Sequence, residues 1–498
     1  YTGASLKVAD ANDDEETRDE STTVLERAAE NFRSTAENVT NYVIKIINKA
    51  TGNDNTLNVT LDNVNIKAKN DAALSVEGEG NTKITLVGRN TLTSGNYHAG
   101  LEHNEKDYYG REDTGKLTIT SGNENGRNTG SLTATGSGAS AGIGSVWNTG
   151  KVSNSGAGTI EITGGDITAI GASDGAGIGS GDGSTGQTTV TIKSGTIKNA
   201  TGGNTGDGIG GGCDSKNITV KIEGGTIEKA KGGDGYGSHD AGDGIHSDGE
   251  LTIPDKATIV SAIGGNGDSR NSSSNAGHGI YSKGDLNISD NATITNATGG
   301  ASTDGYAGDG IHSDGKLTIS GGTIGTAQGG NGNSSRSGTG GDGIYSKTME
   351  ILAGTIIEKA IGGNSTGTGE KDTGGAGISA SDSLAISGWI QQATGGTAKS
   401  GKAGDGIRSD STLNISGGRI EQATGGDSEK YGGSGIYSSV IDLSGSLELT
   451  AKAGSPNGKA LSQNGSELVL DTIKDKLGPG AKVTAINANG DSKQVSIP

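Results

Sequence analysis

The chain contains few of the residues on which most globular domains depend. Its 498 residues include one cysteine, one methionine, one phenylalanine, two tryptophans and four prolines, and only 29% of them are hydrophobic. A single cysteine excludes an internal disulfide and is too isolated for a thiolate metal site, so we interpret Cys213 as an ordinary buried or half-buried thiol. No apolar run approaches the roughly 20 residues that cross a bilayer, and we therefore expect no membrane insertion.

Basic residues are scarce as well. Lysine and arginine number 40 against 58 aspartates and glutamates, which gives a formal net charge of −18. An acidic chain without a basic patch repels nucleic acid, so we expect no nucleic-acid partner. The chain begins at Tyr1 rather than at methionine and shows no signal peptide, which we expect of a processed protein or of a piece of a larger one.

What the chain has in excess is glycine, with 95 residues, in a regular pattern. Nearly the same twelve residues occur as GDGIHSDGELTI at 242–253 and as GDGIHSDGKLTI at 308–319. The isoleucine of the Gly-Ile pair, which we call the anchor, recurs every 29 to 36 residues, about 33 on average. Low hydrophobicity alone would predict disorder, but such a repeat predicts a solenoid. The anchors are Ile143, Ile178, Ile209, Ile245, Ile280, Ile311, Ile344, Ile378, Ile407 and Ile436.

Each repeat indicates three short strands. One strand holds the anchor, an alternating strand such as Leu317–Ser320 follows a turn, and a third strand lies between two Gly-Gly pairs. Three strands per coil, joined by bends at glycine, are typical of a parallel β-helix in which each strand pairs with its copy in the next coil. We therefore predict an all-β, right-handed parallel β-helix, a β-solenoid with coils of about 33 residues and a core of Ile, Leu and Ala.

The pattern divides the chain into five regions. Val24, Leu25 and Phe32 lie on one helical stripe, which predicts an N-terminal helix that caps the open end of the core. The first residues are acidic, and we expect them to be disordered unless they find a partner. The regions are an acidic N-terminal extension (1–21), a capping helix and first strand (22–50), irregular early coils (51–140), regular repeats (141–440) and terminal coils or an end cap (441–498).

The residue after each anchor points outward from the coil. Planar groups at regular spacing can stack on sugar rings, so we interpret this column as a candidate glycan-binding site. The alternative is a ladder that stacks on itself and covers one face of the solenoid. The candidate residues are His246, Tyr281, His312, Tyr345, Arg408 and Tyr437.

Two further columns carry charge. Aspartate and lysine alternate two residues beyond the outward column, which predicts a structural charge ladder that fixes the register of the coils at Asp248, Lys283, Asp314 and Lys347. A carboxylate also recurs two residues before the anchor, at Asp207, Asp243, Asp309, Asp342 and Asp405. Such a column can hold Ca²⁺, which takes six to eight oxygen ligands, or it can bind turn amides as in an Asx-turn.

One stretch carries a resemblance to known proteins. DGIHSDGKLTISGGTI, from Asp309 to Ile324, resembles the secreted bacterial β-helix family that binds calcium and carbohydrate. The versions AGIGS and ATGGNTGDGIGGG resemble glycine-rich repeats of surface proteins from gut and rumen bacteria. The resemblance covers about residues 141–440. It implies a β-helix outside a prokaryotic cell, with a polysaccharide or a cell-surface glycan as partner.

Catalysis is the less favoured interpretation. Parallel β-helices include polysaccharide lyases and glycosidases, and glycoside hydrolysis needs a carboxylate pair at a defined separation. Arg408 beside Asp405 and Asp410 is the one place where a regular column becomes basic, and no other break of the repeat suggests an active site. We therefore expect a non-catalytic adhesin or carbohydrate-binding protein. The alternative is a self-assembling subunit of an extracellular filament, sheath or surface layer, which joins copies of itself through the N-terminal extension.

Overall fold

The structure is a computed structural model that divides the chain into two compact units. Unit 1 consists of Tyr1–Gly233 with Ile245–Gly249, and unit 2 consists of Asp234–Gly244 with Glu250–Pro498. The residues that the structure describes are 4–10, 29–33, 42–50, 56–106, 114–124, 127–128, 130–147, 156–267, 274–303, 305–333 and 338–498.

Unit 1 is built of short strands. They are β1 (Ala4–Asp10), β2 (Ala29–Arg33), β3 (Tyr42–Asn48), β4 (Leu57–Asp62), β5 (Asn65–Lys67), β6 (Leu74–Glu77), β7 (Thr82–Thr93), β8 (Leu101–His103), β9 (Leu117–Ser121), β10 (Asn123–Glu124), β11 (Arg127–Asn128), β12 (Gly130–Thr135), β13 (Ile143–Gly144), β14 (Gly158–Ile162), β15 (Asp166–Ile170), β16 (Ile178–Gly179), β17 (Thr188–Ile192), β18 (Thr196–Thr201), β19 (Ile209–Gly210), β20 (Ile218–Ile222), β21 (Gly225–Ile227), β22 (Ala230–Lys231) and β23 (Ile245–Ser247).

Unit 2 has longer strands and a 3₁₀ helix, η2 (Leu470–Lys476). Its strands are β24 (Leu251–Ile253), β25 (Ala257–Ile263), β26 (Ile280–Ser282), β27 (Leu286–Thr298), β28 (Ile311–Gln328), β29 (Ile344–Ile351), β30 (Ile356–Ile361), β31 (Ile378–Ala380), β32 (Leu384–Ile386), β33 (Trp389–Thr394), β34 (Ile407–Ser416), β35 (Arg419–Thr424), β36 (Ile436–Ser444), β37 (Glu448–Lys452), β38 (Leu461–Gln463), β39 (Ser466–Glu467), β40 (Lys482–Ile486) and β41 (Ser492–Ser496).

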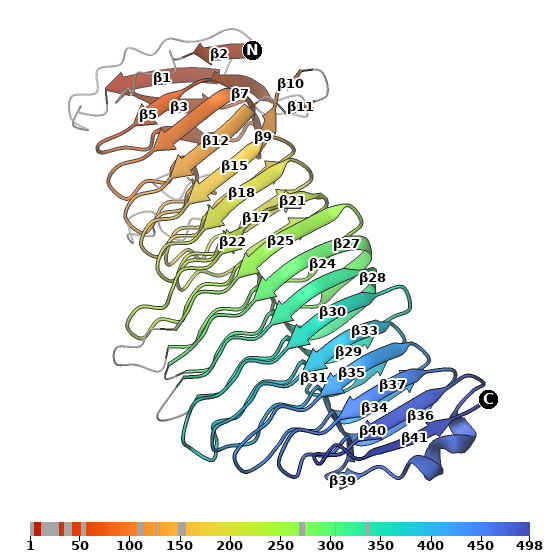
Figure 1. Ribbon diagram of the computed structural model, residues 1–498. Coiled ribbons are helices and arrows are strands. Elements are labelled where there is room, and N and C mark those ends of the chain that lie inside the picture. The colour runs from red at the N-terminus through yellow and green to blue at the C-terminus, as the bar shows by residue number, and fades with distance from the viewer. Residues whose placement is uncertain are drawn as a thin grey trace. The chain divides into compact units, whose positions relative to one another are not determined.

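Both units are all-β parallel solenoids, as the repeat predicts. Together they make about 13 turns of about 31 residues each. The predicted coil of about 33 residues is slightly longer because that average covers only the regular repeats, in which the loops between glycine pairs are long. In Figure 1 the strands of unit 2 from β27 to β37 lie one above another as parallel rungs.

The predicted three strands per coil are found in unit 1, whereas in unit 2 some of them merge, as in β28, which is one continuous strand of 18 residues. In unit 1 the strands β13, β14 and β15 form one coil, and each pairs in parallel with its counterpart among β16, β17 and β18. The anchor Ile143 lies opposite Ile178, which in turn lies opposite Ile209. The anchors of unit 2 are in register in the same way, from Ile280 through Ile311, Ile344, Ile378 and Ile407 to Ile436.

The core is a stack of aliphatic side chains. One coil of unit 2 turns Ile311, Leu317, Ile319, Ile324 and Ala327 inward, and none of them is exposed to solvent. Burying an Ile or Leu side chain contributes about 1.5–3 kcal/mol. Four such residues per coil can therefore hold the solenoid together although the chain as a whole is poor in hydrophobic residues.

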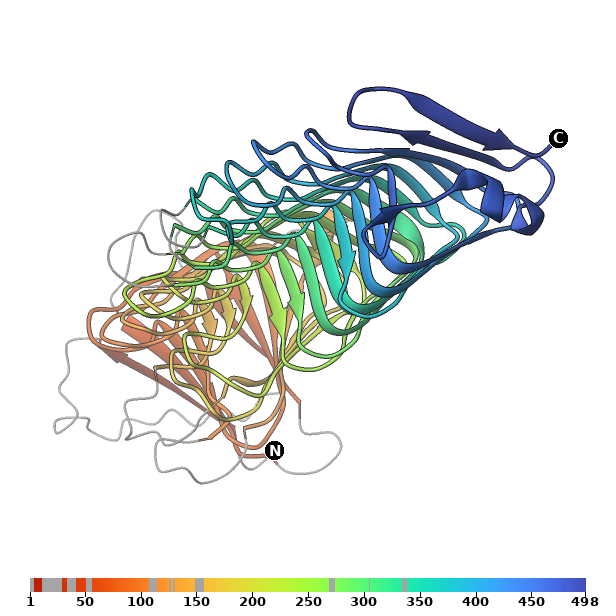
Figure 2. The same ribbon diagram turned by 90° about the horizontal axis from the view of Figure 1, so that it is seen from below.

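Glycine pairs close the neck of each variable loop in unit 2. A Cβ atom on Gly363 would lie 1.7 Å from the carbonyl oxygen of Gly330 in the preceding coil, so only glycine fits there. The close approach allows a chain of hydrogen bonds. The Gly341 N–H donates to the Gly330 carbonyl at 2.9 Å, and the Gly363 N–H donates to the Gly341 carbonyl at 2.7 Å. Figure 2 shows the resulting row of stacked loops in cyan and blue.

The N-terminal capping helix is not confirmed. Ala29–Arg33, inside the range predicted to be helical, forms the strand β2, which pairs in parallel with β4 and places Phe32 opposite Leu61. Pairing with a neighbouring strand outweighs the helical spacing of the apolar side chains, because tertiary context overrides a local pattern. The rest of the predicted helix, residues 22–28 and 34–38, lies outside the described residues.

The strand predicted at the end of the region 22–50 is present as β3 (Tyr42–Asn48), but it is not the first, because β1 and β2 precede it and β2 already pairs in parallel with β4. The acidic extension is expected to be disordered only without a partner, and its residues Ala4–Asp10 have one, because they form β1 and pair antiparallel with β3. Strand β3 is therefore the partner that the extension needs to become ordered. Residues 11–21 of the extension lie outside the described part of the chain.

Unit 2 ends in a change of strand direction. Strand β40 continues the parallel stack on β37, but β41 folds back and pairs antiparallel with β40. The 3₁₀ helix η2 buries Leu470 and Ile473 at this end, and Figure 1 shows it near the C-terminus. The reversal covers the last coil, as solenoids require. Within the described ranges, the structure holds no helix with the length and apolar character to cross a membrane.

Candidate functional site

The residues of the predicted outward column of unit 2 lie in register in successive coils. Tyr281 of β26 lies opposite His312 of β28, and His312 lies opposite Tyr345 of β29. Each follows a fully buried anchor in its strand, so its side chain points away from the core. The stack continues in register through Ser379, Arg408 and Tyr437.

His312 is held between two carboxylates of its own coil. Its Nδ1 lies 2.6 Å from Oδ2 of Asp309, and its Nε2 lies 3.0 Å from Oδ1 of Asp314. The Tyr281 hydroxyl donates to Oδ2 of Asp314 at 2.7 Å. With a carboxylate at each nitrogen, the imidazole must donate twice, which only the protonated ring can do.

The electrostatics agree with a charged ring. Burial acts to lower the pKa of His312, but the hydrogen bonds and charges of Asp309 and Asp314 outweigh it and raise the pKa to about 9. Burial likewise acts to raise the pKa of Asp314, but hydrogen bonds from Tyr281 and His312 outweigh it and lower that pKa. His312 is therefore a cation at neutral pH.

Arg408 occupies an equivalent position farther along the stack. Its Nε lies 2.7 Å from Oδ1 of Asp410, and a terminal nitrogen lies 3.6 Å from Oδ2 of Asp405. Both cases have the spacing Asp-x-x-(His or Arg)-x-Asp, which we call the cation clamp. From the sequence we interpreted the column and the carboxylates as separate features. The sequence motifs DGIHSD and DGIRSD have this spacing and could have shown that the two features belong together.

The rings of the column stack on one another. The centroids of His312 and Tyr345 lie 4.7 Å apart with their planes at 35°, and those of His278 and His312 lie 4.2 Å apart. The Arg408 guanidinium lies 5.2 Å from the centroid of the Tyr437 ring. This self-stacking leaves less of each face for a sugar, and glycan binding by the column stays a prediction.

The carboxylate column binds the backbone of the next coil. In unit 2 the Oδ1 atoms of Asp243, Asp309, Asp342 and Asp405 accept hydrogen bonds from the N–H groups of His278, Asp342, Ala376 and Ser434, at 2.5 to 2.6 Å. His278 replaces aspartate in this column, but it also binds the backbone of the next coil, because its Nδ1 accepts a hydrogen bond from the Asp309 N–H at 2.9 Å. These contacts support the backbone-binding interpretation of the column.

Asp342 is the carboxyl most affected by the crowding of this column. Burial and the charge of Asp309 raise the pKa of Asp342 to about 7, against hydrogen bonds from Ala376 and Ser379 and the charge of Arg408. About half of the Asp342 carboxyls are therefore protonated near neutral pH.

Three side chains of unit 2 lie close enough to share one metal ion. The ligand atoms of His278, Asp309 and His312 all lie within 4.8 Å of one another. Imidazole with carboxylate suits Zn²⁺ or Ni²⁺ better than Ca²⁺, which prefers oxygen. A metal would have to displace the Asp309 hydrogen bonds to both rings, so we interpret the three as a hydrogen-bonded cluster.

The first predicted residues of the column belong to unit 1. His246 of β23 has its Nδ1 at 3.4 Å from Oδ2 of Asp207 and its Nε2 at 3.7 Å from Oδ1 of Asp248. Both carboxylates also hold backbone, since Asp207 accepts from the Gly211 N–H at 2.8 Å and Asp248 from the Ile218 N–H at 3.0 Å. His246 thus also lies between two carboxylates.

The alternating charge ladder of Asp248, Lys283, Asp314 and Lys347 stays a prediction. Asp314 binds the rings of the column, which the alternation of charge did not suggest. The pairing of β28 with β29 is irregular between Ser313 and Lys316, so that two residues of β28 match the single residue Lys347. The side chains at this point therefore do not form a simple rung.

Two exposed tyrosines of unit 2 were missed in the sequence. Tyr306 is 70% exposed and Tyr431 is 55% exposed, and each stands five residues before an anchor. That spacing was the available signal. Their column is linked to the stacked column by Lys402, which is bridged to Tyr431 and has its ammonium 5.0 Å from the Tyr437 ring.

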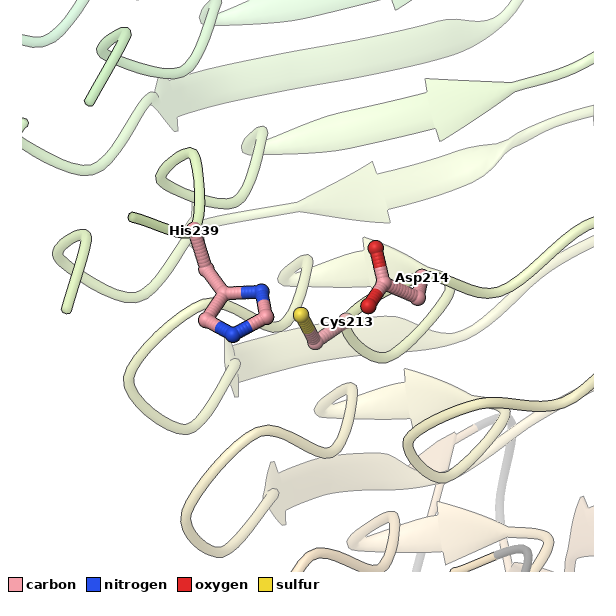
Figure 3. Close-up of side chains that lie close together, drawn as sticks. All are labelled: Cys213, Asp214 and His239. Atoms are coloured by element: carbon pink, nitrogen blue, oxygen red, sulfur yellow. The ribbon is translucent and has the colours of Figure 1, made fainter. Parts of the chain in front are cut away.

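Cys213 of unit 1 is half-buried, as predicted from its isolation. Burial raises the pKa of its thiol to about 11, although a hydrogen bond with Thr205 acts in the opposite direction. The thiol therefore stays protonated at neutral pH and is a poor nucleophile. Figure 3 draws Cys213 with Asp214 beside it, and the His239 in that picture belongs to unit 2.

Comparisons with known proteins add no relative. No protein-family model, no curated protein and no solved structure matches the chain.

Proposed function

We propose that the protein is a non-catalytic, right-handed β-solenoid on the outside of a prokaryotic cell, where it binds polysaccharide and acts in adhesion. The observation that carries the proposal is the pair of exposed tyrosines in one column of unit 2, Tyr306 and Tyr431. An aromatic ring with an exposed face is the side chain on which a pyranose ring stacks. Tyrosine adds a hydroxyl that can bond to the sugar.

The spacing of the two tyrosines favours a chain of sugars over a single one. Their column runs in register through Thr339, Thr373 and Lys402. Four coil rises at the spacing of parallel strands separate the tyrosines by about 19 Å. A polymer that lies along the stack of coils can contact both rings. The stacked column offers it the outward groups of the clamps.

The charge of the protein favours a neutral glycan. The formal net charge is −18, and the two cations of the column, His312 and Arg408, are each neutralised by a pair of carboxylates. An acidic polysaccharide would be repelled, whereas hydroxyl groups can bond to carboxylates, amides and backbone.

Isothermal titration tests the proposal. The probes are a soluble β-glucan, a mannan and a galactan, with polygalacturonate as the acidic comparison. Tyr306→Ala with Tyr431→Ala should weaken binding of the preferred neutral glycan at least about tenfold. Tyr236→Ala is the matched control, because Tyr236 is 57% exposed in the same unit but lies outside the column. Equal binding by the double variant and the control would contradict the proposal.

A second candidate function rests on β1. The proposal is a subunit of an extracellular filament, sheath or layer, in which β1 of one copy pairs with β3 of another. It draws on the antiparallel pairing of β1 with β3, the kind of edge contact that strand exchange uses. Deleting residues 1–21 should then reduce the oligomer to a monomer in light scattering. An unchanged molar mass would exclude this joint.

Calcium remains a prediction for the carboxylate column. The ion would have to compete with the bonds these carboxylates already make, since Oδ2 of Asp309 lies 2.6 Å from Nδ1 of His312 and Oδ2 of Asp405 lies 2.9 Å from the Lys402 ammonium. Ca²⁺ needs six to eight oxygens. Addition of Ca²⁺ should raise the unfolding temperature if the column binds the ion, and a chelator should reverse the change. An unfolding temperature that neither Ca²⁺ nor the chelator changes would exclude calcium binding by this column.

A further inference from the structure

Unit 1 places two of the chain's scarce aromatic residues in contact. The centroids of Tyr97 and Trp147 lie 5.2 Å apart with the planes at 42°. Tyr97 is 54% exposed and Trp147 is half-buried. Trp147 is one of only two tryptophans among 498 residues. A contact between these two at the surface forms an apolar platform in a protein that otherwise buries Ile, Leu and Ala.

The platform is held by strained and specific backbone. Asn96 and Tyr97, in the turn between β7 and β8, have φ values of +32° and +65°, which non-glycine residues seldom adopt. The Ser140 hydroxyl donates to the Tyr97 carbonyl at 2.7 Å and accepts from the Trp147 N–H at 3.0 Å. One side chain thus fixes both aromatic residues. Strain of this kind is found where function requires one geometry.

Gly138 lies directly against the ring of Tyr97. A Cβ atom on Gly138 would lie 2.2 Å from Cδ1 of Tyr97, so any side chain at this position would displace the ring. Gly138 has φ +61°, which also favours glycine. The ring therefore lies against the backbone of Gly138, while 54% of Tyr97 is exposed to solvent.

Polar side chains of the kind that bind hydroxyl groups stand next to the platform. His98 follows Tyr97 in the chain, and its Nδ1 lies 2.7 Å from Oε2 of Glu102 while its Nε2 lies 3.8 Å from Oδ1 of Asp71. The Asn96 amide donates to Oδ1 of Asn70 at 3.0 Å. Carboxylate, amide and imidazole groups beside an aromatic face suit a ligand that is apolar on one side and rich in hydroxyls at its rim.

We infer that Tyr97 and Trp147 form a second glycan-binding site, in unit 1, that stacks a pyranose ring of a neutral polysaccharide. The inference extends the proposed glycan binding but does not require the tyrosines of unit 2. Carboxylates beside the platform exclude an acidic sugar by repulsion, as the net charge of the whole chain does. The hydroxyls at the rim of the ring bond to the polar side chains.

Tryptophan fluorescence tests this site separately from the site in unit 2. Trp389→Phe leaves Trp147 as the only tryptophan, and its emission is followed while a β-glucan, a mannan or a galactan is added. We expect a shift or quench of Trp147 emission that saturates, and no comparable change in Trp147→Phe, whose remaining tryptophan is Trp389. Tyr97→Ala in the Trp389→Phe background should weaken the titration roughly tenfold.

The outcomes distinguish the two sites. A saturating Trp147 signal that persists in Tyr306→Ala with Tyr431→Ala supports the site in unit 1, even if calorimetry shows no role for the unit 2 tyrosines. Calorimetric binding of a glycan without any change in Trp147 emission overturns the inference and leaves the proposed function intact. A signal that Tyr97→Ala does not weaken also overturns it. Far-ultraviolet circular dichroism of each variant checks that the solenoid is folded.

Discussion

The two units place different residues at one position of the same coil. After the anchor, three successive coils of unit 1 have Gly144, Gly179 and Gly210, and only its last coil has a side chain there, His246, whereas unit 2 has mostly aromatic or charged side chains such as His312 and Tyr345. The glycines have φ between +138° and +155°, and the strands β13, β16 and β19 end there after two residues. In unit 2, by contrast, β28 continues for 18 residues and β29 for eight.

The comparison shows that the residue after the anchor decides whether the coil has a side chain on its outer face at this position. A Cβ atom on Gly144 would lie 1.7 Å from the carbonyl oxygen of Gly179, so this column in unit 1 is closed by backbone contact. Where the backbone stays extended, the same position supports a column of side chains, and the cation clamps form on it. The buried anchor stabilises the solenoid, and the residue after it determines whether this face of the coil carries a functional side chain.

Substitution of an anchor should cost the most stability, and the cost should be the same in both units, because every anchor fills the core of its coil in the same way. Ile178→Ala in unit 1 and Ile344→Ala in unit 2 each remove a fully buried side chain and should each cost about 2–5 kcal/mol of unfolding free energy. Denaturant titration of the two variants measures it. A cost in one unit that is several times the cost in the other would break the equivalence of the coils.

Substitution at the residue after the anchor should separate the units. Gly179→Ala forces a Cβ atom to 1.8 Å from the Gly210 carbonyl oxygen at φ +139° and should cost about 2–3 kcal/mol. Tyr345→Ala at the equivalent position of unit 2 should cost about 1 kcal/mol, chiefly the stacking on His312. Equal costs in thermal unfolding would show that the glycine column is not required.

The clamp makes unit 2 sensitive to alkaline pH. The groups that face His312 are Asp309, Asp314, His278, Tyr281 and Tyr345. Its folded pKa of about 9 lies above the ordinary 6.5. The stabilisation is therefore complete below pH 6.5 and is lost as pH rises through 9, by an amount on the order of 3 kcal/mol. His312→Gln should flatten this part of the stability profile, and identical profiles for the two proteins would contradict the clamp.

Unit 1 has the opposite of a cation clamp, because one carboxylate lies between two lysines. Its removal should have the smallest effect on stability. Oε2 of Glu161 lies 3.3 Å from the Lys116 ammonium and 3.1 Å from that of Lys193. Burial acts to raise the pKa of Glu161, but the two lysines outweigh it and lower the pKa. Glu161→Gln should cost less than about 1 kcal/mol at neutral pH, since both lysines are well exposed. The loss should vanish in high salt, and it should also vanish as pH falls from 4.5 through the lowered pKa of Glu161. A salt-independent loss would indicate a packing role instead.

The repeat predicted the fold because each coil repeats one buried pattern. Anchors such as Ile311 and the Gly-Gly pairs carry the same constraint in every coil, so the period can be read without the structure. The N-terminal segment has no copy elsewhere in the chain. There Phe32 lies on a helical stripe in the sequence but pairs in a strand opposite Leu61, and a single copy of a pattern could not reveal this.

The columns of the candidate site were predicted, but their chemistry was not. Alternation along a strand places His312 and Tyr345 on one face, and the repeat then places them in adjacent coils. The bonds of Asp309 to the next backbone and of His312 to Asp314 depend on side-chain geometry within and between coils. Tyr306 lies in a variable loop, where its distance from the anchor was the available signal, and Tyr97 lies in a turn between β7 and β8 that the repeat does not mark.

Calorimetric titration of the intact protein with the neutral glycans tests the central claim most directly. The account predicts saturable binding to at least one of the β-glucan, the mannan and the galactan, weaker binding to polygalacturonate, and at least about tenfold loss in Tyr306→Ala with Tyr431→Ala. Absence of heat with every glycan, or equal affinity in the double variant and in Tyr236→Ala, would contradict it.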